Sequence, residues 1–311
     1  MKKPIITVLM TVYNGESYLT EAIESILYQS YADFEFLIID DASTDSSNKI
    51  ILSYKDDKIR YVRNDYNIGQ TASLNYGLNI ANGKYIARMD QDDLSHKDRI
   101  QTQIKYLINN KNIIVVGSWA NSIDENGVHN YEIIHPTKPD QIKESITCGC
   151  PLSHSSVMFE KDRIIQLGGY PSKFKYAMDW GLWMECIKND FRIANIPKRL
   201  VSIRTHSRNA TSQKSLDITK ISEQYHLIMN SESITVKPIV RRYSNGLKIL
   251  LGLKLLYFFI IKLDFKQSIK IARKILNNNV LYIFPVIYNK AFLRILPTYS
   301  KSFQIEPIVK K

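Results

Sequence analysis

Cysteine is scarce in this chain of 311 residues. Its three cysteines, Cys148, Cys150 and Cys186, lack the spacing of a metal-ligand set and give no sign of a disulfide framework. No G-x-G-x-x-G motif follows the first apolar run, which argues against a dinucleotide-binding oxidoreductase. The apolar stretch at 249–261 is interrupted by Lys254 and is too short to span a bilayer comfortably.

The N-terminus lacks the small-residue cleavage site of a secretory signal peptide. Its apolar run stops at Tyr13-Asn14-Gly15, so we interpret residues 5–12 as a core strand. Together with the scarcity of cysteine, this predicts a protein of the reducing cytoplasm.

Acidic residues are almost absent from the last quarter of the chain. Residues 236–311 hold 15 Lys and Arg but two acids, for a local charge of +13, whereas residues 1–235 carry −1. We therefore predict a folded domain at 1–235 and a basic, mainly helical extension at 236–311. Apolar, aromatic and basic residues interleave in this extension, which favours peripheral attachment to the anionic inner face of the cell membrane.

Two other interpretations of the extension stay open. Its helices could pack on the domain with their cations in solvent. Nucleic acid is a weaker candidate partner, because no nucleic-acid-binding motif accompanies the charge, and we expect none.

Apolar runs of strand length alternate with segments of helical periodicity. Strands are predicted at 5–12, 34–39, 59–62, 85–89, 113–118, 155–159 and 199–205, and helices at 16–29, 43–54, 69–81, 97–109 and 179–188. Asn14 is a candidate cap for the first helix. This alternation predicts an α/β fold with a mostly parallel sheet flanked by helices.

Polar residues gather where three predicted strands end, at the edge where such sheets bind ligands. They are Thr11, Tyr13, Asp40, Asp41, Asp90, Asp92 and Asp93. The acidic run, residues 90–93, packs three like charges together, which is costly unless a cation neutralises them. Carboxylates suit a hard divalent ion that also holds phosphate oxygens. The alternative is an acidic turn that caps the next helix.

Taken together, these motifs resemble family 2 glycosyltransferases, which are inverting enzymes with the GT-A, Rossmann-like fold and often build bacterial surface polysaccharides. The resemblance rests on the segments VLMTVYN at 8–14, SILYQS at 25–30, FLIIDDASTD at 36–45, NIG at 67–69 and DQDD at 90–93. It covers the first 100 residues closely and weakens towards residue 210. The basic extension lies outside it.

The resemblance implies roles for the acidic run. Asp90-Gln91-Asp92 looks like the DxD motif, in which Asp92 would bind Mn²⁺ or Mg²⁺ and Asp90 would contact the ribose or a metal-bound water. Asp93 would be a supporting acid or only a charge at the start of a helix. His206 resembles a histidine that approaches the metal, although a lone histidine is more often structural.

The resemblance also implies a binding site for a nucleotide-diphosphate sugar. The residues that match it are Thr11, Tyr13, Glu16, Asp40, Asp41, Asn67 and Gly69. Arg88 could face a phosphate or anchor its strand. For Thr11 and Tyr13, packing at the strand end is the alternative.

Inverting transfer needs a base that takes a proton from the acceptor hydroxyl. By resemblance Asp179 is that base, with helix capping as the alternative, and Met178 replaces the usual Glu. His154, Gly169 and Trp180 would line the acceptor side.

The predicted activity is metal-dependent transfer of a hexosyl or N-acetylhexosaminyl group, with a UDP-sugar as the expected donor and a glycan or lipid-linked glycan as the acceptor. The competing functions are a nucleotidyltransferase and an inactive glycan- or membrane-binding scaffold on the same fold.

Overall fold

The computed structural model describes residues 4–207, 209, 218–234, 245 and 247. The chain divides into two compact units, one of Met1–Ile142 with Cys150–Gln213 and one of Lys143–Gly149 with Lys214–Lys311. Nearly all of the predicted extension at 236–311 lies outside the described residues, so its helices and the domain boundary at 235 stay predictions.

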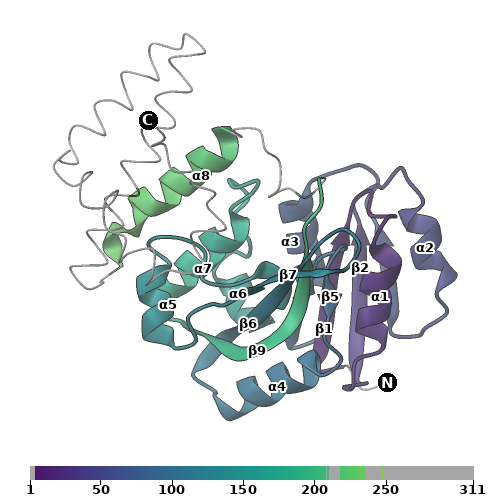
Figure 1. Ribbon diagram of the computed structural model, residues 1–311, viewed down its shortest axis with the longest axis horizontal. Coiled ribbons are helices and arrows are strands. Elements are labelled where there is room, and N and C mark those ends of the chain that lie inside the picture. Colours follow the sequence, from purple (N-terminus) through teal and green to yellow (C-terminus); the bar gives the residue numbers. More distant parts are fainter. Residues whose placement is uncertain (1–3, 208, 210–217, 235–244, 246, 248–311) are drawn as a thin grey trace, which may run out of the picture. The chain divides into compact units, whose positions relative to one another are not determined.

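The first unit is built on a mixed sheet that runs β3-β2-β1-β4-β8-β6-β9-β5 through the described residues, with β7 added to β6 (Figure 1). Its first four strands are all parallel, as predicted. They are β1 (Ile6–Val12), β2 (Phe34–Asp40), β3 (Ile59–Arg63) and β4 (Tyr85–Met89). Each was expected within a residue of these bounds. Mainly apolar runs mark β1, β2 and β4, which are buried on both faces. Strand β3 is only partly buried.

Beyond β4 the pairing alternates in direction. Strand β8 is antiparallel to both β4 and β6, β6 is parallel to β9, and β5 and β7 are antiparallel additions. The bounds are β5 (Leu94–Ser95), β6 (Ile113–Ile123), β7 (His129–Ile133), β8 (Met158–Glu160) and β9 (Arg192–Arg204). Strand β9 begins seven residues before the predicted start at 199, and β8 is shorter than the predicted strand at 155–159, because residues His154–Ser156 form the short helix η1.

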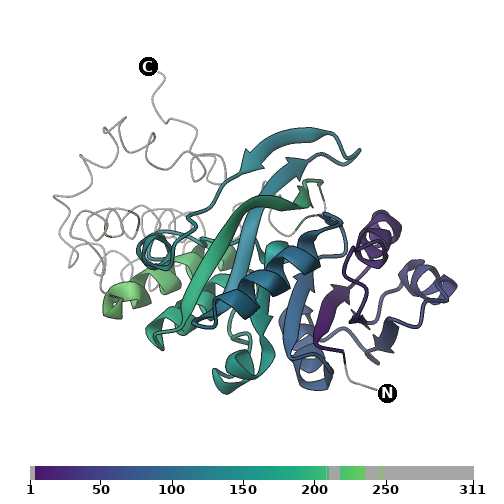
Figure 2. The same cartoon turned by 90° about the horizontal axis from the view of Figure 1, so that it is seen from below.

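Helices cover both faces of the sheet (Figures 1 and 2). The helices of the first unit are α1 (Leu19–Leu27), α2 (Ser47–Ser53), α3 (Gln70–Ile80), α4 (Arg99–Asn109), α6 (Lys161–Gln166) and α7 (Met178–Lys188), and α5 (Pro139–Ser145) crosses the division between the units. The second unit contains α8 (Ile218–Met229) and η2 (Asn230–Ser233).

Alternate residues of β1 explain this layering. Val8 and Met10 join a buried cluster with residues of α1 and α4. Leu9 faces the other way, where a Cβ added to Gly77 of α3 would come within 2.5 Å of its Cδ1. The period-two alternation of a strand thus places α3 opposite α1 and α4, and a glycine allows the close approach.

Helix starts were predicted less well than strands. Asn14 does not cap α1, which begins four residues after Gly15. It adopts a positive φ of 50° and accepts a hydrogen bond from the Thr44 N–H. Helix α4 begins at Arg99, six residues after Asp93, so the acidic run does not cap a helix. Both the capping alternative and the helix-start role of Asp93 are therefore wrong.

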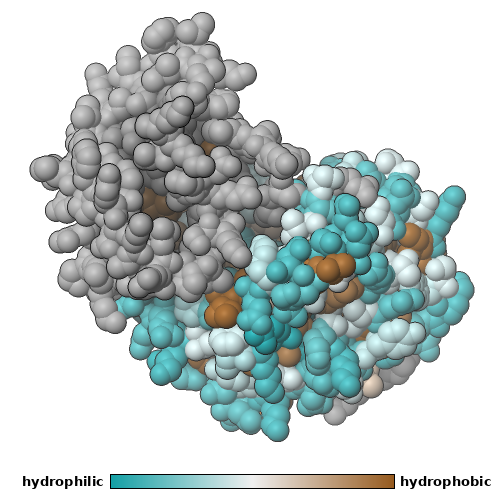
Figure 3. All heavy atoms as spheres, viewed as in Figure 1, coloured by the Kyte–Doolittle hydropathy of each residue, from teal (hydrophilic) through white to brown (hydrophobic). Residues whose placement is uncertain are grey.

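The surface seen in Figure 3 is mostly hydrophilic, with single apolar side chains scattered over the described part. In the described residues, no helix is long and apolar enough to cross a membrane.

Candidate active site

Three parallel strands deliver polar side chains to one edge of the sheet. Val12 lies opposite Asp40 in the β1–β2 pair, and Met10 lies opposite Met89 in the β1–β4 pair. The residues that follow these strands therefore emerge at the same carboxyl edge, as the sequence predicted.

The acidic run does not form one cluster of equal charges. Asp90 Oδ2 lies 2.5 Å from Arg88 Nη1, and its Oδ1 accepts a long 3.4 Å hydrogen bond from Gln70. Arg88 is fully buried, and its Nε and Nη2 have no hydrogen-bond partner in the described residues. Burial acts to raise the pKa of Asp90, but the Arg88 charge and hydrogen bonds outweigh it and lower that pKa.

Ser155 joins Asp90 to Asp93. Its hydroxyl lies 2.5 Å from Asp90 Oδ2 and also contacts Asp93 Oδ2, while the other oxygen of Asp93 accepts the Arg204 N–H. A hydroxyl donates only one proton, so one carboxyl must be protonated to make the second contact. Burial and the charges of Asp92 and Asp90 raise the pKa of Asp93 well above its usual value. Of these two carboxyls, Asp93 is therefore the one that takes up a proton more readily.

Asp92 faces His206, as the resemblance implied. His206 Nε2 lies 3.0 Å from Asp92 Oδ2, which also accepts a 2.9 Å hydrogen bond from Asn209 Nδ2. The pKa of Asp92 is raised by burial and by the Asp90 charge. The ring of Tyr18 stacks 4.8 Å from that of His206, and the Arg204 guanidinium lies 4.6 Å from the Tyr18 ring. Tyr18 and Arg204 were not predicted as site residues, because neither belongs to a motif.

The described residues contain no group of three or more His, Cys, Asp or Glu side chains placed to hold a metal ion. Asp92 and His206 nevertheless fit such an ion in part. They present one carboxylate and one imidazole, leaving the remaining positions to phosphate and water oxygens.

Gln91, the middle residue of the DxD-like motif, joins the ends of β1 and β4 through hydrogen bonds. Its Oε1 accepts the Tyr13 N–H at 2.8 Å, and its Nε2 donates to the Tyr13 carbonyl at 3.2 Å. The Tyr13 side chain is 47% exposed, so its ring is available to stack on a base. Thr11 is buried, and its Oγ1 has no hydrogen-bond partner in the described residues.

Asp41 organises the loop before α3. It accepts hydrogen bonds from the N–H groups of Ile68 and Gly69 and from the Asn64 amide, all at 2.8–2.9 Å. Gly69 has a φ of 88°, a backbone conformation that favours glycine. Asn67 in the same loop is exposed. Each oxygen of Asp41 can accept two hydrogen bonds, so Oδ2 retains capacity for a ligand donor.

The carboxylates of Asp40 and Glu16 accept hydrogen bonds from neighbouring protein groups. Asp40 is fully buried and accepts from the Ser43 N–H, the Tyr61 hydroxyl and Arg63. Glu16 accepts the Ser46 N–H. Contact of either residue with a nucleotide stays a prediction.

His154 and Tyr170 form a pair beside Arg88. The His154 Nε2 lies 2.9 Å from the Tyr170 hydroxyl, and the two rings meet edge to face. Burial and the Arg88 charge lower the pKa of His154 well below its usual value, so the imidazole is neutral. Asn75 of α3 holds Tyr170 through reciprocal 2.8 Å hydrogen bonds with its backbone N–H and carbonyl.

The loop that precedes α7 contains Gly169, which has a φ of 73°; a Cβ there would come within 2.5 Å of Asn75 Oδ1. Asp179 lies in the first turn of α7, where its Oδ1 accepts the N–H of the next residue, Trp180, at 2.7 Å. Burial raises the pKa of Asp179. The Trp180 side chain is 3% exposed, and Trp183 lies in the core against Phe159.

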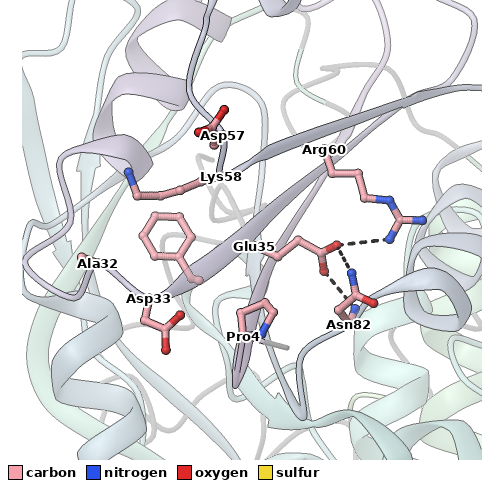
Figure 4. A pocket seen from close by; sticks show the side chains of 9 residues that line it. Pro4, Ala32, Asp33, Glu35, Asp57, Lys58, Arg60 and Asn82 are labelled. Carbon is pink, nitrogen blue, oxygen red and sulfur yellow. Dashed lines mark hydrogen bonds and ion pairs between the residues drawn. The ribbon is translucent and has the colours of Figure 1, made fainter. Parts of the chain in front are cut away.

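A pocket of about 410 Å³ lies at the opposite edge of the sheet (Figure 4). Its lining comes from the amino ends of β2 and β3 and from residues next to β1 and β4. Glu35 is the buried acid there, and its oxygens accept hydrogen bonds from Thr7, Arg60 and Asn82. This satisfied network stabilises the strand starts, and none of the predicted site residues lies in it.

Solved structures share this fold. S. aureus TarS 1-349, in complex with UDP-GlcNAc, superposes with a TM-score of 0.65 at 19% identity over 96% of this chain and 87% of that one. The mannosyltransferase PcManGT from Pyrobaculum calidifontis, in complex with GDP-Man and Mn²⁺, gives 0.60 at 16% identity over 98% and 89%. The sheet therefore has the predicted GT-A fold.

Sequence comparison identifies the family. The pattern described as glycosyl transferase family 2 matches residues 7–163. An uncharacterised glycosyltransferase of Methanocaldococcus jannaschii is 36% identical over 223 residues, which are 67% of this chain and 73% of that protein. EpsE of Bacillus subtilis, named as a glycosyltransferase, is 32% identical over 252 residues, 77% and 90% of the two chains. The chain belongs to glycosyltransferase family 2, and it is a glycosyltransferase.

Proposed function

We propose that the enzyme transfers a hexosyl or N-acetylhexosaminyl group with inversion from a nucleotide-diphosphate sugar, with UDP as the expected nucleotide, to a hydroxyl of a glycan or lipid-linked glycan. The observation that carries this proposal is the Asp92–His206 pair, 3.0 Å apart beside the carboxyl edge that also carries Tyr13 and Asp41. Solved relatives of the same fold bind UDP-GlcNAc, or GDP-Man with Mn²⁺.

In this proposal Asp92 and His206 hold a divalent cation, Mn²⁺ or Mg²⁺. When bound, the cation would neutralise the charge that grows on the departing diphosphate. Asp90 contacts the ribose from its place beside Arg88. Tyr13 stacks on the base, and Asp41 offers Oδ2 to a base N–H.

Asp179 is the proposed base. Its carboxylate has about four acceptor sites, of which the Trp180 N–H occupies one on Oδ1, so it can receive the proton of an acceptor hydroxyl as that oxygen attacks the anomeric carbon. Burial raises the pKa of Asp179 and so strengthens it as a base. His154 and Gly169 lie on the acceptor side.

The test is turnover with a panel of nucleotide sugars, with and without Mn²⁺. Asp179→Asn should reduce transfer by about two or more orders of magnitude, the order of a general-base contribution. Asp92→Ala should cause a comparable loss, because it removes the proposed metal ligand. Asp33→Asn, an exposed acid at the opposite edge, is the control. Full transfer by both site variants contradicts the mechanism. Release of pyrophosphate from a nucleoside triphosphate indicates a nucleotidyltransferase, and donor binding without turnover indicates a scaffold.

Membrane attachment is part of the same proposal. The supporting observation is the net charge of +13 on residues 236–311. The full chain should bind anionic vesicles at low salt and release them at high salt, because salt screens surface charge. Equal binding to zwitterionic vesicles would contradict this. A role in surface polysaccharide synthesis at the cytoplasmic face fits such an attachment.

A further inference from the structure

The fold brings Cys150 against Asp179, although 29 residues separate them in the sequence. The Cys150 Sγ lies 3.6 Å from Asp179 Oδ2 and 3.4 Å from the Leu152 carbonyl oxygen. A thiol has one proton, so it donates to one acceptor at a time, and an ionised carboxylate is the stronger acceptor. Asp179 can therefore draw the S–H towards itself when it is charged.

The thiol is the only side-chain hydrogen-bond donor that contacts Asp179 within the described part of the chain. The other oxygen of the carboxylate accepts the Trp180 backbone N–H. Two charged residues also shift the pKa of Asp179, one in strand β4 and one just after it. Arg88 favours the ionised form, and Asp90 opposes it. Tyr170 lies in the loop that precedes α7, and the Asp179 charge contributes to raising its pKa.

Cys150 itself is poorly suited to act as a nucleophile. Burial and the neighbouring Asp179 charge raise the pKa of its thiol well above the usual value. A thiol that stays protonated is a hydrogen-bond donor, because only the thiolate reacts readily.

We propose that Cys150 is a positioning residue for the base Asp179. Its S–H donates to Oδ2, fixes the rotation of the carboxylate about χ2 and favours the ionised form, so that the unused acceptor sites face the incoming hydroxyl. This inference rests on the proposed role of Asp179 in transfer. No bond is made or broken at sulfur.

The first experiment compares the pH dependence of kcat/KM for the wild type, Cys150→Ala and Cys150→Ser at saturating Mn²⁺. Loss of the donor in Cys150→Ala should move the acid limb to higher pH, giving about three- to ten-fold lower kcat/KM on that limb and little change on the plateau, the size expected for one weak hydrogen bond to a charge. Cys150→Ser should restore the wild-type limb, because its hydroxyl donates from the same position.

Cys148→Ala, two residues away, is the matched control and should keep the wild-type profile. An equal loss at every pH in Cys150→Ala, or a Cys150→Ser profile that matches Cys150→Ala, would overturn the proposal in favour of a packing role.

The second experiment does not depend on turnover. In a Cys148→Ala background, alkylation of Cys150 by iodoacetamide is followed by mass spectrometry with and without Asp179→Asn. Removal of the carboxylate charge should speed alkylation several-fold, because that charge raises the thiol pKa. An unchanged rate contradicts the contact. Faster alkylation together with full transfer by Asp179→Asn confirms the contact and refutes the proposed base instead.

Discussion

Asp93→Asn should stabilise this enzyme, although it removes an acid from the DxD-like segment. Asp93 is 3% exposed, its Oδ1 accepts the Arg204 N–H at 2.8 Å, and its Oδ2 contacts the Ser155 hydroxyl. An asparagine can keep both contacts, because its carbonyl accepts from Arg204 and its amide donates to Ser155. Below the folded pKa of Asp93, the substitution therefore replaces a neutral acid by a neutral amide of the same shape.

The sign of the effect follows from the pKa of Asp93. Burial and the charges of Asp92 and Asp90 raise that pKa well above its unfolded value. The stability that Asp93 contributes is thus fully present below the unfolded pKa, about 3.9, and is lost as the pH rises through the folded pKa. Asparagine does not titrate. Its advantage is absent near pH 3.5, grows as the pH rises and levels off above the folded pKa.

The gain is the free energy of protonating a buried acid that is ionised in the unfolded chain, about 1–3 kcal/mol. For a chain of this size it corresponds to a rise of about 2–10 °C in melting temperature. Thermal unfolding of metal-free protein between pH 4 and pH 8 measures it. Asp90→Asn is the control with the opposite sign, because the pKa of Asp90 is lowered and its ion pair with Arg88 stabilises the fold above the unfolded pKa. A destabilised Asp93→Asn, or a gain that is the same at every pH, would refute the protonated Asp93.

Three further outcomes can be measured. Asn75→Ala removes both hydrogen bonds to the Tyr170 backbone. It should lower the free energy of unfolding in urea by about 1–3 kcal/mol and should also lower kcat. Asn79→Ala, on the exposed side of α3, should change neither. Gln91→Ala removes the two hydrogen bonds that position the Tyr13 backbone and should raise KM for the donor about five- to ten-fold. An unchanged KM would contradict the proposal that Tyr13 stacks on the base. Removal of divalent metal with EDTA should abolish transfer without unfolding the protein. Unfolding in EDTA would show that the fold needs the cation to neutralise the carboxylates of Asp90, Asp92 and Asp93.

The parts of the fold that local patterns encode were predicted from the sequence. Strands β1, β2 and β4 consist mainly of apolar residues, and their shared edge follows from parallel pairing. Strand β5, by contrast, has two residues and was missed, because Leu94–Ser95 is too short to show a period. The start of β8 was predicted too early. Ser155 was assigned to the strand, but it lies in the short helix η1, and its hydroxyl donates a hydrogen bond to Asp90.

Sequence motifs marked some residues of the candidate site but not others. The resemblance pointed to Asp92 and His206, and the structure brings them together across 114 residues of sequence. Ser155 and Arg204 carry no motif, and their roles depend on which strands become neighbours. Cys150 was noted only as a cysteine outside any framework. Its contact with Asp179 comes from tertiary packing, which short-range spacing does not encode.

Three carboxylates so close in the sequence are expected to need a cation. In the structure, the protein itself compensates two of the three. Asp90 pairs with the buried Arg88. Asp93 contacts Ser155, and burial and its acidic neighbours raise its pKa, which favours the uncharged form. Asp92 remains, beside a histidine and an amide rather than a fixed positive charge. We therefore expect the fold to form without metal. A divalent ion would then meet one uncompensated carboxylate, so its affinity would depend on the donor's diphosphate, whose charge completes the ligand set.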